Sequence, residues 1–163
     1  MWVAPNSNLS AYRYVELARY VPEIDRVTRV QKYVDKDHKQ PLWVYGDAIT
    51  HFRKKNKNNG VYTSVFQYEY PDPMATFVGP LYFDFDHKDD PSIALSEARK
   101  LLEFFSAYVS DRATRIFFSG SKGFHVELEP VAMGIDPGRE LHTLFKFIAR
   151  DLISKLVLSY LDL

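Results

Sequence analysis

The chain has 163 residues, of which 46% are hydrophobic and 15% aromatic, a size and composition typical of one folded domain rather than of a disordered segment. Lys and Arg together number 21, as do Asp and Glu, so no overall positive field draws the protein to nucleic acid. Cysteine is absent, which excludes disulfides, thiolate catalysis and cysteine-based zinc sites. No apolar run reaches the length of a membrane span and no secretory signal is recognisable, so we expect a cytoplasmic protein with no membrane partner.

The first sixty residues give weak, local signals. The expected elements are, in chain order, a short helix at residues 9–20 that ends before Pro22, a strand at residues 26–34, an apolar run at residues 42–45, a helix through residues 51–55 with Asp47 as its cap, and a turn at residues 58–60. Cations cluster near the end of this part, at Arg53, Lys54, Lys55 and Lys57. Such a run is either a solvated surface segment or a contact for nucleic acid.

The elements after residue 60 are clearer. We expect strands at residues 61–68, 81–86, 114–118 and 124–129, a helix from Pro91 to about residue 109 capped by Asp90, and a helix from residue 139 to about residue 160. This order predicts an α+β fold, an antiparallel or mixed sheet with helices packed on one face. The whole chain, residues 1–163, is expected to form one domain, with a part of uncertain structure at residues 1–60 and the main part at residues 61–163.

Two carboxylates, Asp84 and Asp86, occupy alternate positions of the strand at residues 81–86. Because side chains alternate across a strand, both carboxylates face one side, and Phe83 and Phe85 face the other. Two like charges on one face repel each other unless a cation or a proton compensates, and a divalent ion that prefers oxygen ligands suits such a pair. The alternative is an ordinary polar strand face in contact with solvent.

A loop of small residues joins the strands at residues 114–118 and 124–129. Gly120 and Gly123 let the backbone expose N–H groups in a concave turn, Ser119 adds a hydroxyl group, and Lys122 adds a charge that suits phosphate. His125 lies on the polar face of the returning strand. The alternative is a plain hairpin whose glycines serve the turn alone.

The carboxylate pair and the loop with its histidine indicate a common site when they are considered together. If the strand at residues 114–118 pairs beside the strand at residues 81–86, the polar faces of both lie on one side of the sheet. The carboxylate pair, the loop and the histidine then fit a nucleoside triphosphate with its metal ions.

Residues 81–86 and 118–126 resemble the first two motifs of the catalytic domain of the archaeo-eukaryotic primase superfamily, the primase–polymerases: a hydrophobic strand with Asp-x-Asp, then a Ser-x-His-type loop and strand after an intervening helix. The likeness covers residues 79 to 129, with a weaker likeness at residues 62–70. It implies an RRM-like sheet, Mg²⁺ or Mn²⁺ held by Asp84 and Asp86, and contacts from Ser119, Lys122 and His125 to the phosphates of the incoming nucleotide.

The resemblance also implies a function. It indicates a DNA primase or DNA-directed polymerase, a nucleotidyltransferase that synthesises or extends primers on a single-stranded DNA template from NTP or dNTP, by attack of a 3′-hydroxyl on the α-phosphate. The partners it implies are the template and a replicative helicase or another replisome subunit. The location it implies is the cytoplasm, at the nucleoid during replication, or the nucleus in a eukaryote.

One part of the family pattern is not matched. The family has a third metal-binding carboxylate on a strand after the second helix, whereas here the predicted helix runs almost to residue 163 and Asp162 is the only carboxylate near that place. The sequence therefore predicts a truncated or degenerate domain, which also lacks the family's Cys/His zinc insertion. Two other functions stay open: an RRM-like module that binds single-stranded nucleic acid through exposed aromatic rings, and a catalytically inert scaffold of a replication complex.

Overall fold

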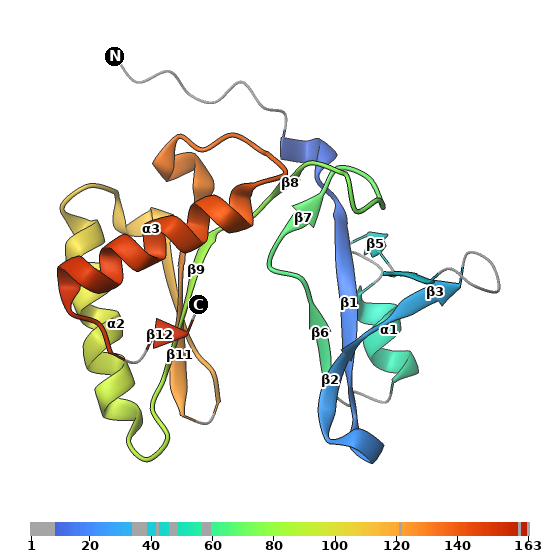
Figure 1. Cartoon of the computed structure of the whole chain (residues 1–163), viewed down its shortest axis with the longest axis horizontal. Helices are drawn as coiled ribbons and strands as arrows, with labels where there is room; N and C mark the ends of the chain where they lie inside the picture. The colour runs from blue at the N-terminus through green and yellow to red at the C-terminus, as the bar shows by residue number, and fades with distance from the viewer. Residues whose placement is uncertain are drawn as a thin grey trace. The chain divides into compact units, whose positions relative to one another are not determined.

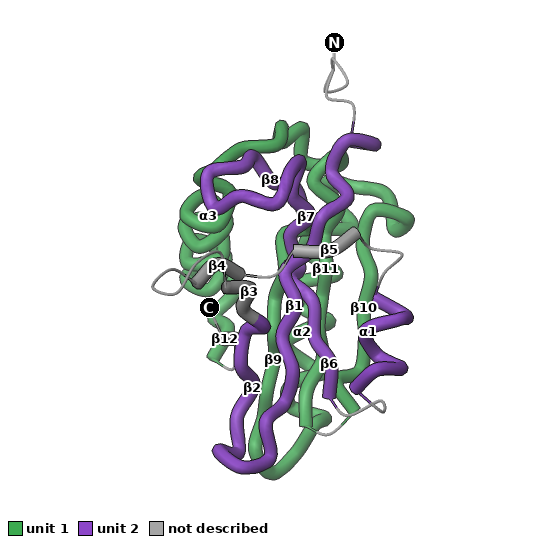
Figure 2. The backbone as a smooth tube through the Cα atoms, turned by 90° about the vertical axis from the view of Figure 1, so that its right-hand side faces the viewer, with its two compact units in different colours: residues 1–7, 79–163 green, residues 8–78 purple. Residues whose placement is uncertain are grey.

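The computed structural model describes residues 9–33, 39–41, 43–45, 49–56, 60–120, 122–159 and 161–162, with the backbone alone for 31–33, 39–41, 43–45 and 161–162. The chain divides into two compact units, residues 8–78 and a second unit that contains residues 79–163 (Figure 2). The sequence predicts one domain with its main part from residue 61, whereas in the structure the unit that holds the carboxylate strand begins at Gly79. Across the described residues, no helix combines the length and the apolar character that crossing a membrane requires.

The unit of residues 8–78 is built around one long central strand (Figure 1). Its elements are β1 (Tyr14–Val21), β2 (Arg26–Arg29), β3 (Gln31–Tyr33), β4 (Lys39–Pro41), β5 (Trp43–Tyr45), α1 (Ile49–Lys55), β6 (Val61–Thr63), β7 (Gln67–Tyr68) and β8 (Phe77–Val78). Strand β1 pairs antiparallel with β2, β5, β6 and β7, β8 extends the sheet beyond β7, and β3 and β4 pair with each other. The expected helix through residues 51–55 is confirmed, while Asp47 and residues 58–59 of the expected turn lie outside the described residues.

The expected helix at residues 9–20 is wrong. The chain makes a single 3₁₀ turn at Leu9–Ala11 and then enters β1. Val15 and Leu17 are both buried, whereas Glu16 between them is partly exposed, so the burial repeats every two residues, as in a strand. The strand expected at residues 61–68 is likewise split into β6 and β7, with residues 64–66 between them.

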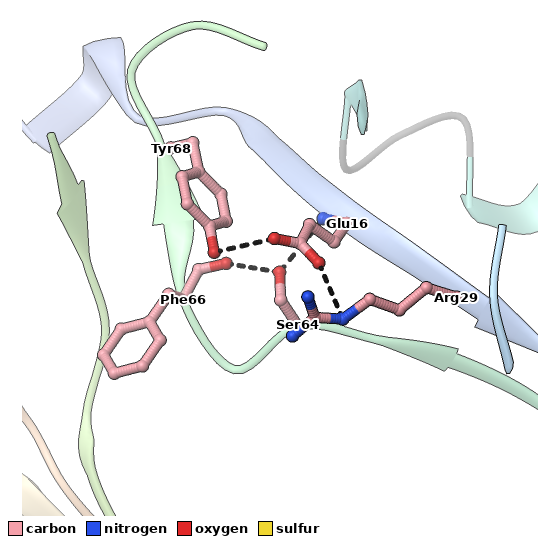
Figure 3. Close-up of polar contacts among 5 residues, drawn as sticks. All are labelled: Glu16, Arg29, Ser64, Phe66 and Tyr68. Atoms are coloured by element: carbon pink, nitrogen blue, oxygen red, sulfur yellow. Dashed lines mark hydrogen bonds and ion pairs between the residues drawn. The ribbon is translucent and has the colours of Figure 1, made fainter. Parts of the chain in front are cut away.

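A half-buried carboxylate fixes the centre of this unit (Figure 3). The Tyr68 hydroxyl donates to Glu16 Oε1 at 3.1 Å, and Arg29 Nε lies 3.4 Å from Glu16 Oε2. Ser64 Oγ accepts from the Glu16 backbone N–H at 3.0 Å and donates to the Phe66 carbonyl at 2.7 Å. Burial, followed by the charge of Glu16, raises the pKa of Tyr68 to about 12, so its phenol stays protonated and keeps donating throughout the neutral pH range.

The unit that begins at Gly79 is a four-stranded antiparallel sheet with two helices on one side (Figure 1). Its elements follow in the order β9 (Leu81–Asp86), α2 (Pro91–Ser106), β10 (Thr114–Phe118), β11 (Gly123–Leu128), α3 (Leu141–Leu156) and β12 (Leu161–Asp162). The strands lie in the order β10-β11-β9-β12, so the expected α+β class is confirmed. The strand next to β9 is β11, which carries His125, and not β10 as the sequence argument supposed.

The core of this unit explains the direction of the β9 side chains. Phe83 and Phe85 are fully buried, and the Phe83 ring packs 5.8 Å from the ring of Phe105 on α2. Helix α2 starts where the sequence predicts, because the Asp90 side chain accepts from the Ser92 backbone N–H at 2.8 Å and Pro91 opens the first turn. The apolar side chains of β9 therefore pack against the helices, and the polar side chains of β9 lie on the opposite face of the sheet.

The expected extension of α3 to residue 160 is wrong. The helix ends at Leu156 because Val157 adopts the left-handed conformation, with φ 53°, and Leu158 is buried beyond it. Both carboxylate oxygens of Glu97, a buried residue of α2, then accept from the Ser159 backbone N–H at 2.9 and 3.0 Å. The chain returns to the sheet as β12, whose Asp162 pairs in register with Asp84.

Val157→Gly is expected to raise the free energy of unfolding by about 0.5–1 kcal/mol. A β-branched residue is strained in the left-handed region, and glycine removes that strain at a smaller cost in backbone entropy. Urea denaturation followed by circular dichroism measures the change. Ser154→Gly, at an exposed position inside α3, is the control and is expected to destabilise by about 0.5 kcal/mol. A destabilised Val157→Gly protein would contradict the assigned conformation.

Candidate active site

The polar face of the sheet in the unit that begins at Gly79 carries the predicted site. Asp84 and Asp86 lie on the face of β9 opposite to buried Phe83 and Phe85, as the alternation predicts. In the pairing of β9 with β11, His125 is directly opposite Asp84, and Gly123 is directly opposite Asp86. Directly opposed residues of an antiparallel pair share a face, so the histidine strand and the carboxylate strand present their polar groups on the same side.

Each carboxylate of the pair has a basic partner on the hairpin. His125 Nε2 lies 3.1 Å from Asp84 Oδ1, and these side chains are 30% and 33% exposed. Lys122 Nζ lies 2.9 Å from Asp86 Oδ2. The structure thus brings four of the predicted residues into two adjacent acid–base pairs. The Lys122 ammonium offsets the charge of Asp86, and the polar His125 ring lies against Asp84, which lowers the cost of placing two carboxylates on one strand face.

The hairpin between β10 and β11 is closed by Ser119 and Gly123. Ser119 Oγ accepts from the Gly123 N–H at 3.0 Å, and the Ser119 N–H donates to the Gly123 carbonyl at 2.9 Å. Gly120 has φ +92°, a conformation that glycine adopts without strain. The Ser119 hydroxyl, expected to contact phosphate, thus also serves as an acceptor within the turn.

Gly123 is required by close packing. A Cβ atom at this position would lie 2.1 Å from Asp86 Oδ1 and 2.2 Å from the carbonyl oxygen of Phe85. The absence of a side chain therefore lets β11 approach the end of β9 at the point where Asp86 meets Lys122. The sequence pattern predicts this glycine in the loop, whereas it is the first residue of β11.

Burial, together with neighbouring charges, shifts the pKa of two other side chains on the polar face. Burial raises the pKa of the Tyr82 phenol well above its usual value, and the charges of Asp84, Glu127 and Asp86 add to the shift. Burial also raises the pKa of Glu127, an effect that Arg115 partly opposes. The Tyr82 ring packs against His125 with 5.1 Å between ring centroids. The part of the Tyr82 pKa shift that comes from the neighbouring carboxylates is the part that a bound cation would reduce.

Asp162 was expected at the end of a helix but lies in a strand. Its position in β12 is directly opposite Asp84, so three aspartates belong to the adjacent strands β9 and β12. Residues 161–163, an aspartate between two leucines, have the alternation of a strand. The helical pattern before them led to the prediction of a helix up to about residue 160 instead. A left-handed valine carries no sequence signature comparable to a glycine cap.

The donor set fits a divalent ion that prefers oxygen. Asp84 and Asp86 supply carboxylate oxygens that are partly open to solvent, with side chains 33% and 27% exposed. Among the side chains that the structure describes, no group of three or more His, Cys, Asp or Glu residues is placed to hold a metal. Mg²⁺ commonly binds through one or two carboxylates, with water and substrate phosphate completing its shell, so two carboxylates are enough.

The predicted nucleic-acid contact lies in the other compact unit. Arg53, Lys54 and Lys55 form the last turn of α1 and are exposed, whereas Lys57 is outside the described residues. The three described cations are thus available to solvent, as both interpretations of the run require.

Comparisons with models of protein families, with curated proteins and with solved structures find no match to this chain.

Proposed function

We propose that this protein is a primase–polymerase-type nucleotidyltransferase, which adds NTP or dNTP to primers on single-stranded DNA with Mg²⁺ or Mn²⁺. The observation that carries the proposal is the meeting of Asp84 and Asp86 with His125 and Lys122 on one face of adjacent strands, at distances of 3.1 and 2.9 Å between the paired atoms. Carboxylates for cations beside basic groups for phosphates are the parts that phosphoryl transfer needs.

The topology supports the same proposal. The succession β-α-β-β-α-β with strand order β10-β11-β9-β12 is the order of a split βαβ sheet, the arrangement expected of an RRM-like core. The register of Asp162 opposite Asp84 supplies a candidate for the third carboxylate. This register supports Asp162 over any other residue as that carboxylate.

Each residue has a defined role in the proposal. Asp84 and Asp86 hold the divalent ions, with Asp162 as the third ligand. Lys122 and Ser119 contact the triphosphate, and His125, oriented by Asp84, contacts it from the adjacent strand. When bound, the ions polarise the α-phosphate and stabilise the charge that develops during attack of the primer hydroxyl. Arg53, Lys54, Lys55 and Lys57 are proposed to contact the template.

The direct test is primer extension and primer synthesis on a single-stranded DNA template. The full chain is incubated with dNTP or NTP, with Mg²⁺, with Mn²⁺, or with a chelator, and products are resolved by length. Incorporation that needs the cation supports the proposal. Oligonucleotide binding that needs no metal, unaffected by substitution of Asp84 and Asp86 together and unaccompanied by incorporation, would favour the RRM-like binding module instead.

Lys122→Ala and His125→Ala are each expected to raise the dissociation constant for dATP in saturating Mn²⁺ by about tenfold or more, because each removes a charged or polar contact to phosphate. Isothermal titration calorimetry measures the constant. Lys100→Ala, an exposed lysine of α2, is the matched control and is expected to bind dATP as the wild type does. An equal loss of affinity for a single-stranded oligonucleotide would contradict the triphosphate assignment.

A further inference from the structure

We propose that Phe117 is the platform on which the base of the bound nucleoside triphosphate stacks. The inference deepens the proposed function and rests on it, because it assigns the base of the same nucleotide whose phosphates are placed at Lys122 and His125. It adds a specificity-neutral binding residue on β10, a strand that the motif argument left without a functional side chain facing the site.

The pairing of β10 with β11 puts Phe117 on the polar face. Phe117 is directly opposite His125, and Phe118 is directly opposite Phe124. The ring of Phe118 packs 5.3 Å from the ring of Phe124, as expected for neighbours that share a face. Phe117, one residue away, therefore belongs to the alternate face, with His125 and Asp84.

Phe117, His125 and Asp84 form a row across three adjacent strands. Strands in a sheet lie about 4.8 Å apart, so Phe117 starts about 5 Å from His125 and about 10 Å from Asp84 at the level of the backbone. A nucleotide whose phosphates contact His125 and the hairpin extends from there by the length of its sugar. Its base then lies within reach of the next strand in the row.

Phe117 is the aromatic side chain of β10 that lies on the polar face, and its ring is open to solvent. The residue is 45% exposed and lies beside charged and polar groups, not in the core. A planar apolar ring open to solvent offers a stacking surface that accepts any base, since every base has a π-face. The ring therefore adds affinity for nucleotides without selecting among bases.

The charge of the face favours a free nucleotide over a nucleic-acid strand at this ring. Four carboxylates lie at or near it, Asp84, Asp86, Glu127 and Glu129. Lys122 already pairs with Asp86, and Arg115 already pairs with Glu129. A polyanionic strand meets repulsion there, whereas the bound divalent cations neutralise much of the negative charge of a triphosphate.

The test compares Phe117→Ala with Phe118→Ala, since both rings are exposed but lie on opposite faces. The full chain is titrated with dATP and, separately, with inorganic tripolyphosphate, which has no base, both in saturating Mn²⁺. Phe117→Ala is expected to raise the dissociation constant for dATP roughly 5- to 150-fold, the loss of one stacked base, and to leave that for tripolyphosphate unchanged. Phe118→Ala is expected to change neither, and Phe117→Trp to bind dATP at least as tightly as the wild type.

Four results would overturn the inference: no binding of dATP by the wild type, equal binding by Phe117→Ala, a parallel loss for tripolyphosphate, or a loss confined to a single-stranded oligonucleotide. The last would assign the ring to the template. Thermal denaturation of each variant verifies that the sheet is intact. The proposed function fails separately, if the wild type binds dATP through Phe117 but incorporates no nucleotide.

Discussion

Asp84→Asn is expected to lower metal-dependent nucleotide incorporation by about a hundredfold or more while leaving the fold intact. The amide keeps the size of the side chain but loses the charge that holds the divalent ion, and electrostatic stabilisation of this kind is a large term in phosphoryl transfer. The loss of repulsion with Asp86 also predicts equal or slightly higher thermal stability. Primer extension and thermal denaturation on the same preparation measure the two effects.

The control for this substitution is Asp89→Asn, in the exposed segment between β9 and α2, which is expected to keep wild-type incorporation. Asp86→Asn is expected to behave like Asp84→Asn. If Asp84→Asn incorporates nucleotides at the wild-type rate, the carboxylate does not hold the catalytic ion and the proposed function loses its principal support.

Gly123→Ala is expected to lower the free energy of unfolding by about 2 kcal/mol or more. The added Cβ would lie 2.2 Å from the Phe85 carbonyl oxygen, and a backbone atom in a sheet between two neighbours cannot move away as the end of a side chain can. The strands β9 and β11 must separate at this end. Urea denaturation midpoints, with the slope checked for constancy, measure the loss.

Gly138→Ala is the matched control, because the nearest atom to its added Cβ is 3.9 Å away, an ordinary contact. Its expected change is within about 0.5 kcal/mol. Because Asp86 Oδ1 lies 2.1 Å from the added Cβ of Gly123, Gly123→Ala is also expected to weaken binding of dATP in Mn²⁺. Two glycine variants of equal stability would contradict the close approach of the two strands.

The sequence was informative where local signals agreed with packing. The strand at Leu81–Asp86 alternates apolar and polar residues, and the helix after it has both a cap and a proline at its start, so both are where the pattern predicts. The opposite case is β1, in which apolar residues at positions compatible with a helix belong to the centre of a sheet. Strand β1 pairs with four other strands, and three of them, β5, β6 and β7, come from segments more than twenty residues away, which no local pattern reports.

The candidate site was predicted in the same uneven way. The faces of Asp84, Asp86 and His125 follow from alternation alone. Their proximity depends on β11 lying next to β9, whereas the sequence predicted that the other strand of the hairpin, at residues 114–118, would lie there. The position of Asp162 depends on the left-handed conformation of Val157 and on the hydrogen bond that the Ser159 N–H donates to Glu97 of α2. Functional roles came from the resemblance, since spacing by itself leaves an ordinary polar hairpin open.

The position of Asp162 opposite Asp84 depends on Glu97, a residue on the other side of the sheet. Glu97 lies on α2, which covers the apolar side of the sheet. Its carboxylate accepts a hydrogen bond from the backbone of Ser159, 62 residues later in the sequence and shortly before β12, the strand that carries Asp162. If the proposed function is correct, substitutions of Glu97 are expected to lower activity together with substitutions of the aspartates, because they release the chain at Ser159 just before β12. The role of Glu97 in that case is to hold the chain that leads into β12, and not to contact the substrate.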